Sequence, residues 1–291
     1  MQTALQLLVT TLQIGAVYIL FSLGLTLIFG IMRVVNFVHG HFFALSALMV
    51  SVLVPKVMDA GYTVQSAYLL AALGAMAVSL ALAALLYKFG LAHFLRDMDG
   101  AFILTMGMAL FLDGVFLGLF GGAVRSVPQV IEGTVSILGA PITIQRLLLC
   151  LLAGVVTLTL YWSLGSTKLG KALRAVAADH EAAMLQGIPY GRIAFTGFMI
   201  AALLAAFAGV LIAPVSVVSP VMGTDYLMKT FIAVVVGGLG SVPGAIVGAL
   251  FIGFIEAVGG YYFDSSTATV AMFIIVIVVL LFRPKGLLGH A

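Results

Sequence analysis

Seven long apolar runs constrain the fold of this chain more than any other feature of its sequence. A run of about 20 apolar residues can cross a bilayer as an α-helix. Only 8% of the residues are charged, against about 25% in soluble domains, which is too few to cover a water-soluble surface. The sequence therefore predicts an all-α polytopic membrane protein with one transmembrane domain over residues 1–291. The runs cover residues 5–31, 40–57, 67–89, 101–121, 145–164, 193–214 and 267–282.

Two segments, residues 24–49 and 231–256, are apolar but interrupted by glycine or polar residues. The second lies in the apolar stretch 226–259, which GGLGSVPGA divides at 237–245. Unpaired backbone groups cannot face lipid, so such breaks survive where protein buries them or where they line an aqueous path. Paired breaks point to a transport pathway, whereas the alternative is close helix packing through small residues, which Gly244-x-x-x-Gly248 fits. We expect seven to nine transmembrane helices with two broken or re-entrant Gly-rich segments.

The distribution of Lys and Arg predicts the orientation, because short cytoplasmic loops carry an excess of basic residues. We place the charged loop 165–192 in the cytoplasm. The N-terminus is then outside and the C-terminus cytoplasmic, provided that 226–259 enters and leaves on the outer side or crosses twice. The basic excess reports topology, and no nucleic-acid partner is expected. The basic residues assigned to the inside are Arg33, Lys88, Arg96, Lys168, Lys171, Arg174, Arg192, Arg283 and Lys285, and those assigned to the outside are Lys56, Arg125, Arg146 and Lys229.

The charged loop contains a near match to a nucleotide-binding motif. Residues 165–172, GSTKLGKA, almost read GxxxxGK[ST]. Ala172 has no hydroxyl for Mg²⁺, however, and an apolar span rather than a strand precedes the motif. We therefore predict no ATPase within this chain.

The same loop has the pattern of one short helix. Leu169, Leu173 and Val176 repeat at spacings of three to four residues, and Gly187 and Pro189 provide a helix stop. Such a helix either docks against a cytosolic partner or lies solvated at the membrane surface.

Four polar residues in apolar surroundings are candidates for function. Asn36 and His39 can hydrogen-bond exposed backbone at a helix break, or they can contact a passing substrate. Asp113 and Glu256 are acids within apolar segments, where ionisable residues are functional candidates by default. Either acid can serve proton transfer, or it can pair with a hydroxyl or a basic side chain between helices.

Several motifs resemble one family of membrane proteins. Glu181-Ala-Ala-x-x-x-Gly187 resembles the EAA-xxx-G core of the cytoplasmic loop in permeases of ATP-binding-cassette (ABC) importers, although the later I-x-L-P part of that motif is absent. Asn36-Phe-Val-His-Gly40, the block GGLGSVPGAIVGA and the ending RPKGLLG are similar to LivH-type permeases, which import branched-chain amino acids. The order of these elements also agrees, so the resemblance covers nearly the whole chain.

The resemblance implies a transport subunit of the bacterial cytoplasmic membrane, not an enzyme. It implies a LivM-type second permease, two cytosolic ATP-binding subunits, a periplasmic or extracellular substrate-binding protein and surrounding lipid as partners. ATP and Mg²⁺ then belong to the partner ATPases, and this chain binds no cofactor. Alternatives are a permease of the same family for urea or short amides, and a stand-alone ion-coupled secondary transporter. The expected substrate-pathway residues are Asn36, His39, Gly40, Gly237, Gly238, Gly240 and Ser241, and the expected ATPase-coupling residues are Glu181, Ala182, Ala183, Gly187 and Arg174.

Overall fold

The computed structural model of the chain describes residues 2–95, 97–137 and 140–289. Arg96, which the orientation count places inside, lies outside these residues. The described part is helical apart from one short hairpin. Its elements are α1 (Gln2–Met32), α2 (His39–Asp59), α3 (Val64–Phe89), a 3₁₀ turn (Leu91–His93), α4 (Met98–Phe120), β1 (Thr134–Ile137), β2 (Ala140–Thr143), α5 (Ile144–Ser166), α6 (Lys168–Ala178), α7 (His180–Leu185), α8 (Tyr190–Ile212), α9 (Met222–Gly237), α10 (Val242–Tyr262) and α11 (Ser265–Phe282).

Seven helices in the described ranges are long and apolar enough to cross a membrane: α1, α2, α3, α4, α5, α8 and α10. Six of them match predicted spans. The seventh, α10, forms the second half of the divided stretch 226–259, whereas the predicted span at 267–282 falls on α11, a shorter apolar helix. The break predicted at 237–245 is confirmed, because α9 ends at Gly237 and α10 begins at Val242.

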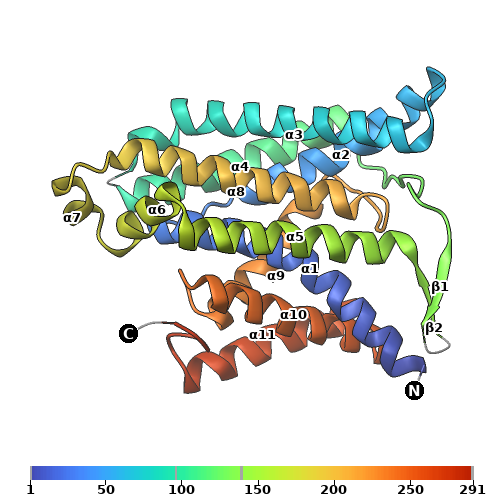
Figure 1. Cartoon of the computed structure of the whole chain (residues 1–291). Helices are drawn as coiled ribbons and strands as arrows, with labels where there is room; N and C mark the ends of the chain where they lie inside the picture. Colours follow the sequence, from blue (N-terminus) through green and yellow to red (C-terminus); the bar gives the residue numbers. More distant parts are fainter. Residues whose placement is uncertain (1, 96, 138–139, 290–291) are drawn as a thin grey trace.

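Helix α1 is the centre of the bundle and packs against α10, α8, α5 and α9 (Figure 1). Helices α1, α2 and α8 are mostly buried, whereas α3, α4 and α5 expose long apolar faces. Lipid tails are as apolar as leucine, so helices in a membrane associate by close packing rather than by hydrophobic burial. Gly253 of α10 shows this, because a side chain there would come within 3.0 Å of the Gly15 backbone of α1.

Two local features differ from the sequence prediction. Strands β1 and β2 form an antiparallel hairpin, with Thr134 opposite Thr143, in a chain expected to be all-α. The charged loop forms two helices, α6 and α7, where one was predicted. The chain bends at Asp179, whose extended backbone stops α6 and whose side chain begins α7.

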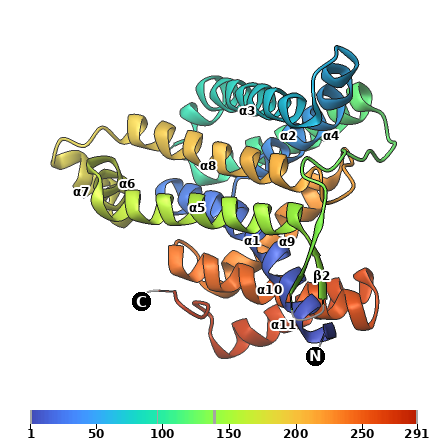
Figure 2. The same cartoon turned by 45° about the vertical axis from the view of Figure 1, so that its right-hand side comes forward.

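The two ends of the bundle carry different elements. The N-terminus and the β hairpin lie at one end, and α6 and α7 lie at the other (Figures 1 and 2). The C-terminal segment lies on the side of α6 and α7 (Figures 1 and 2). The most charged loop and the basic C-terminal segment therefore share one end, as the sequence prediction requires.

Candidate functional site

The first break is the segment between α1 and α2, residues 33–38. Asn36 is buried there, and its Oδ1 accepts a hydrogen bond from the Val38 amide at 3.1 Å. His39, the first residue of α2, is also buried, and its Nε2–H donates to the carbonyl oxygen of Phe21 at 3.1 Å. Phe21 lies well inside α1, so α2 begins within the bundle rather than at its end. Both side chains bond backbone groups, the structural alternative that the sequence left open for them.

Gly40 lies where the first turns of α2 and α9 meet. A side chain on Gly40 would overlap the carbonyl of Gly223, and a side chain on Gly223 would overlap the carbonyl of Gly40. On the other side of α2, Gly24 of α1 leaves room for the imidazole of His39, since a Cβ there would lie 2.7 Å from the ring. The cavity beside Asn36 has only about 10 Å³, close to the space of one water. In this conformation these residues hold α1, α2 and α9 together.

The second break is the turn between α9 and α10. Gly238 and Gly240 have φ of 112° and 80°, a backbone region that glycine adopts without steric cost. Ser241 caps α10, and its Oγ accepts a hydrogen bond from the Gly244 amide at 3.2 Å. Gly237 and Gly244 lie so close that a side chain on either would overlap the carbonyl of the other. The turn therefore joins two tightly packed helices.

The C-terminal segment covers this turn. The amide of Leu287 donates to the carbonyl of Val236 at 2.7 Å, and the amide of Leu288 donates to the carbonyl of Gly237 at 2.9 Å. These bonds satisfy carbonyls that the end of α9 leaves without helical partners. The two groups of predicted pathway residues are not brought together, because Gly40 contacts one end of α9 and Gly237 forms the other, roughly 21 Å away along the helix.

The charged loop forms a compact pair of helices at the end of the bundle. The carboxylate of Asp179 accepts hydrogen bonds from the amides of Glu181 at 2.9 Å and Ala182 at 3.1 Å. Hydrogen bonds from the backbone of Ala182 and then Glu181 lower the pKa of the Asp179 carboxyl below its usual value. Gly187 follows the end of α7 with φ of 80°, so the predicted helix stop is confirmed. Asp179 was missed, although an Asp at the cap position with a Glu in the first turn is a helix-start signal.

The predicted coupling residues differ in their exposure and in the helix to which they belong. Glu181 and Ala182 are exposed, whereas Ala183 is buried. The Arg174 guanidinium belongs to α6 and donates to the carbonyl of Gly165 at 3.3 Å, so it supports the junction with α5. Leu185, which sequence reasoning did not single out, is 87% exposed at the end of α7.

A cavity of about 630 Å³ lies beside α7. Glu181 and Leu185 line it from α7, and Arg33 lines it from the end of α1. Exposed apolar and charged side chains therefore stand next to a hollow on one surface, which is an arrangement that can receive a protein partner.

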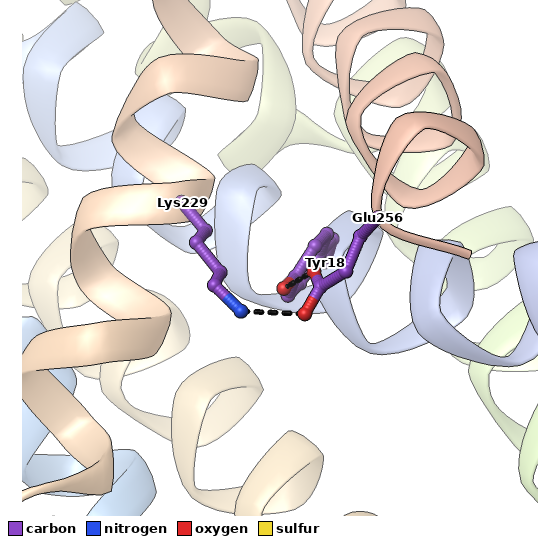
Figure 3. Close-up of polar contacts among 3 residues, drawn as sticks. All are labelled: Tyr18, Lys229 and Glu256. Carbon is purple, nitrogen blue, oxygen red and sulfur yellow. Dashed lines mark hydrogen bonds and ion pairs between the residues drawn. The ribbon is translucent and has the colours of Figure 1, made fainter. Parts of the chain in front are cut away.

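Each acid that the sequence placed within the membrane has a partner. His41 Nε2 of α2 lies 3.0 Å from Asp113 Oδ1 of α4. Glu256 of α10 accepts a hydrogen bond from the Tyr18 hydroxyl of α1 through Oε2 and one from Lys229 Nζ of α9, 2.5 Å from Oε1 (Figure 3). Lys229 lies within α9 and not in a loop, although the sequence placed it among the basic residues of the outer side. In the sequence, the signal for this cluster was Lys229, a single lysine in the apolar stretch 226–259.

These features define the class of protein as a multi-pass helical membrane protein with two chain breaks and a charged loop at one end of the bundle. Residues 7–282 match the family described as branched-chain amino acid transport system / permease component. The chain is 31% identical to the high-affinity branched-chain amino acid transport system permease protein BraD of Pseudomonas aeruginosa, over 98% of this chain and 96% of BraD. It is 29% identical to the permease protein LivH of Escherichia coli (strain K12), with the same coverage. A ribose import permease protein, RbsC of Escherichia coli (strain K12), is 33% identical over 35% of this chain and 34% of its own length.

The chain belongs to this family of ABC-transporter permease components. It is therefore a multi-pass membrane transport component and not an enzyme. No solved structure shows a significant match to the chain.

Proposed function

We propose that this chain is one permease subunit of an ABC importer that moves branched-chain amino acids into the cytoplasm by alternating access. The relatives that match over 98% of the chain are permease proteins of branched-chain amino acid transport systems, which supports the substrate class. The observation that carries the coupling mechanism is the exposed helix α7, fixed by Asp179 and presenting Leu185 beside a large cavity. A stand-alone secondary transporter would have no use for such a docking surface.

The proposed assembly contains a LivM-type second permease and two cytosolic subunits that bind ATP and Mg²⁺. A periplasmic or extracellular binding protein delivers the substrate. The apolar faces of α3, α4 and α5 then lie against lipid or the second permease. Residues 1–291 act as one permease domain, with residues 165–192 as its cytoplasmic coupling loop.

The proposed topology has the N-terminus outside and the C-terminus in the cytoplasm. The shared location of the charged loop and the C-terminal segment supports it. Backbone hydrogen bonds tie the α9–α10 turn to that same segment, which favours a path in which α9 runs from within the bundle to the cytoplasmic end and α10 returns across the membrane. Because α2 begins within the bundle, residues 33–38 form the re-entrant segment of the first half.

We also propose that the two breaks contribute to the substrate pathway in another conformation. Opening the contact between Gly40 and Gly223 would separate the first turns of α2 and α9 and expose the groups of Asn36 and His39. Movement of the turn from Gly237 to Ser241 would act at the cytoplasmic end. Cysteines introduced at these positions should gain reactivity toward a soluble thiol reagent when ATP and loaded binding protein are added, whereas unchanged reactivity would argue against this path.

Coupling is tested with Glu181→Lys and Gly187→Trp in proteoliposomes that contain the full complex. The first reverses an exposed charge on α7, and the second places a bulky residue at φ of 80°, a region that such residues rarely adopt. Both variants should insert normally and lose leucine uptake. Gln186→Ala, at an exposed neighbour, is the matched control. Wild-type coupling between ATP hydrolysis and uptake in the two variants would refute the docking role of α7.

A further inference from the structure

Tyr18, Lys229 and Glu256 form a charged cluster between three helices that the proposed coupling mechanism does not use. Lys229 and Glu256 retain 19% and 18% of their side-chain exposure, so both can be reached from cavities. The aromatic ring of Tyr18 is held edge-on by Tyr226, with centroids 5.8 Å apart. Both oxygens of the Glu256 carboxylate are engaged, one by a phenol and one by an ammonium group (Figure 3).

Stability alone does not account for this cluster. Ionisable groups within a membrane are costly, and they mark ion or substrate pathways by default. A buried ion pair is often no more stabilising than apolar residues of the same size. Three helices that already pack through small residues therefore have little structural need of two charges at this point.

The two members of the ion pair line two different cavities. The first, of about 450 Å³, is lined by Glu256 and Arg146, with apolar walls that include Ile14. We call it the Arg146 cavity. The second, of about 370 Å³, is lined by Lys229 and Asp225, with apolar walls that include Phe273. We call it the Asp225 cavity.

The lining of both cavities is chemically complementary to an aliphatic zwitterion. Each holds one basic and one acidic side chain beside apolar walls. Each volume falls in the range of about 300–1,000 Å³ that is usual for small-molecule sites. The Arg146 cavity is also lined by residues from the N-terminal part of α1 and from β2, which lie at the proposed outer end of the bundle.

We propose that the Lys229–Glu256 ion pair is the site at which the permease binds the ammonium and carboxylate groups of its amino acid substrate, an inference that rests on the proposed function. The ammonium group of the substrate replaces Lys229 on Glu256, while Tyr18 keeps its hydrogen bond to the same carboxylate. The carboxylate of the substrate pairs with the released Lys229. Two ion pairs then stand where one stood, so no charge is left unpaired in the apolar interior, where an isolated charge is very costly.

The branched side chain of the substrate lies against the apolar walls in this arrangement. Ion-pair exchange also gives a route between the two cavities, because Glu256 lines one and Lys229 lines the other. The cluster thus selects a molecule that carries an ammonium group and a carboxylate group on the same carbon, and it rejects urea or an amide, which carry neither charged group.

The test is leucine uptake by the full complex in proteoliposomes, with ATP hydrolysis measured in the same sample. The variant is Lys229→Met combined with Glu256→Gln, which removes both charges and leaves neither partner unpaired. We expect uptake to fall at least tenfold while ATP hydrolysis remains stimulated by loaded binding protein. The matched control is His41→Gln combined with Asp113→Asn, which removes the other intramembrane pair and should keep uptake within twofold.

Tyr18→Phe provides a second variant that leaves the ion pair in place. It removes one hydrogen bond from Glu256, and we expect a loss of uptake of about two- to tenfold. This variant decides the question if the doubly neutral protein fails to insert.

Wild-type uptake in the Lys229/Glu256 variant, or an equal loss in the His41/Asp113 control, would overturn the inference and leave the proposed function standing. So would wild-type uptake in the Tyr18→Phe protein. A wild-type complex that takes up no branched-chain amino acid would instead refute the proposed function, and the inference with it.

Discussion

Replacement of Leu185 by alanine tests directly whether α7 is buried against a cytosolic partner. Leu185 is 87% exposed in the isolated chain. Burial contributes about 0.8 kcal/mol per methylene, so the roughly three carbons that alanine lacks correspond to about 2.4 kcal/mol for complete transfer from water. Scaled by the exposed fraction of 87%, about 2 kcal/mol is available from docking. Because about 1.4 kcal/mol is a factor of ten in affinity, the ATP-binding subunits should bind about 30-fold more weakly.

The assay is equilibrium binding of a fluorescently labelled ATP-binding subunit to the permease pair in lipid nanodiscs. Gln186→Ala is the matched control, because Gln186 is also exposed on the same loop but offers little apolar surface. Leu185→Met should bind like the wild type, since it preserves apolar volume. Binding of Leu185→Ala within twofold of the wild type, with normal insertion, would show that α7 is not the docking element and would refute the reasoning.

Three further predictions concern stability and pH. Gly223→Leu should lower the free energy of unfolding by about 1–3 kcal/mol or prevent assembly of the bundle, because the new side chain overlaps the α2 backbone. Gly107→Leu, at a position with open space around it, is the control. Equal thermal unfolding of the two variants would contradict the role of the Gly40–Gly223 contact. Removal of residues 284–291 should cost about 1–3 kcal/mol, because two carbonyls at the end of α9 lose their hydrogen bonds, and unchanged denaturant unfolding in detergent would argue against it. The Asp179 cap should stabilise α7 fully at pH values above the ordinary Asp pKa. This stabilisation should be lost only as pH falls through the lowered pKa of Asp179. The measurement is amide exchange of α7 in the wild type and in Asp179→Ala at each pH. The extra protection of the wild type should stay constant between about pH 5 and 8. It should disappear at lower pH, whereas Asp179→Ala should show no such loss in acid.

The spans could be predicted from the sequence because the length of an apolar run reports its environment directly. The break at Gly237–Ser241 and the stop at Gly187 were also predictable, since glycine at positive φ and a capping serine are local signals. The split of the charged loop had a local signal too, in Asp179. The hairpin of β1 and β2 gave no signal as strong, because two strands of four residues are too short for a clear alternation.

The candidate site depended on contacts between residues far apart in the chain. Tyr18 and Glu256 are 238 positions apart, and no local pattern joins them. The sequence marked Glu256 as a candidate and left its partner open. It also gave no means of knowing that the glycines predicted for the pathway would lie near opposite ends of α9.

The sequence by itself determined that this chain is a membrane permease, because apolar length, charge scarcity and loop motifs are all properties of short stretches of chain. Only the tertiary structure decided that α2 begins inside the bundle, that Leu185 projects beside a cavity and that Lys229 meets Glu256. Those facts depend on how helices cross, and the crossings are set by close backbone approaches such as that of Gly40 and Gly223. A glycine in a sequence permits such an approach, but it does not specify which helix will pack against it.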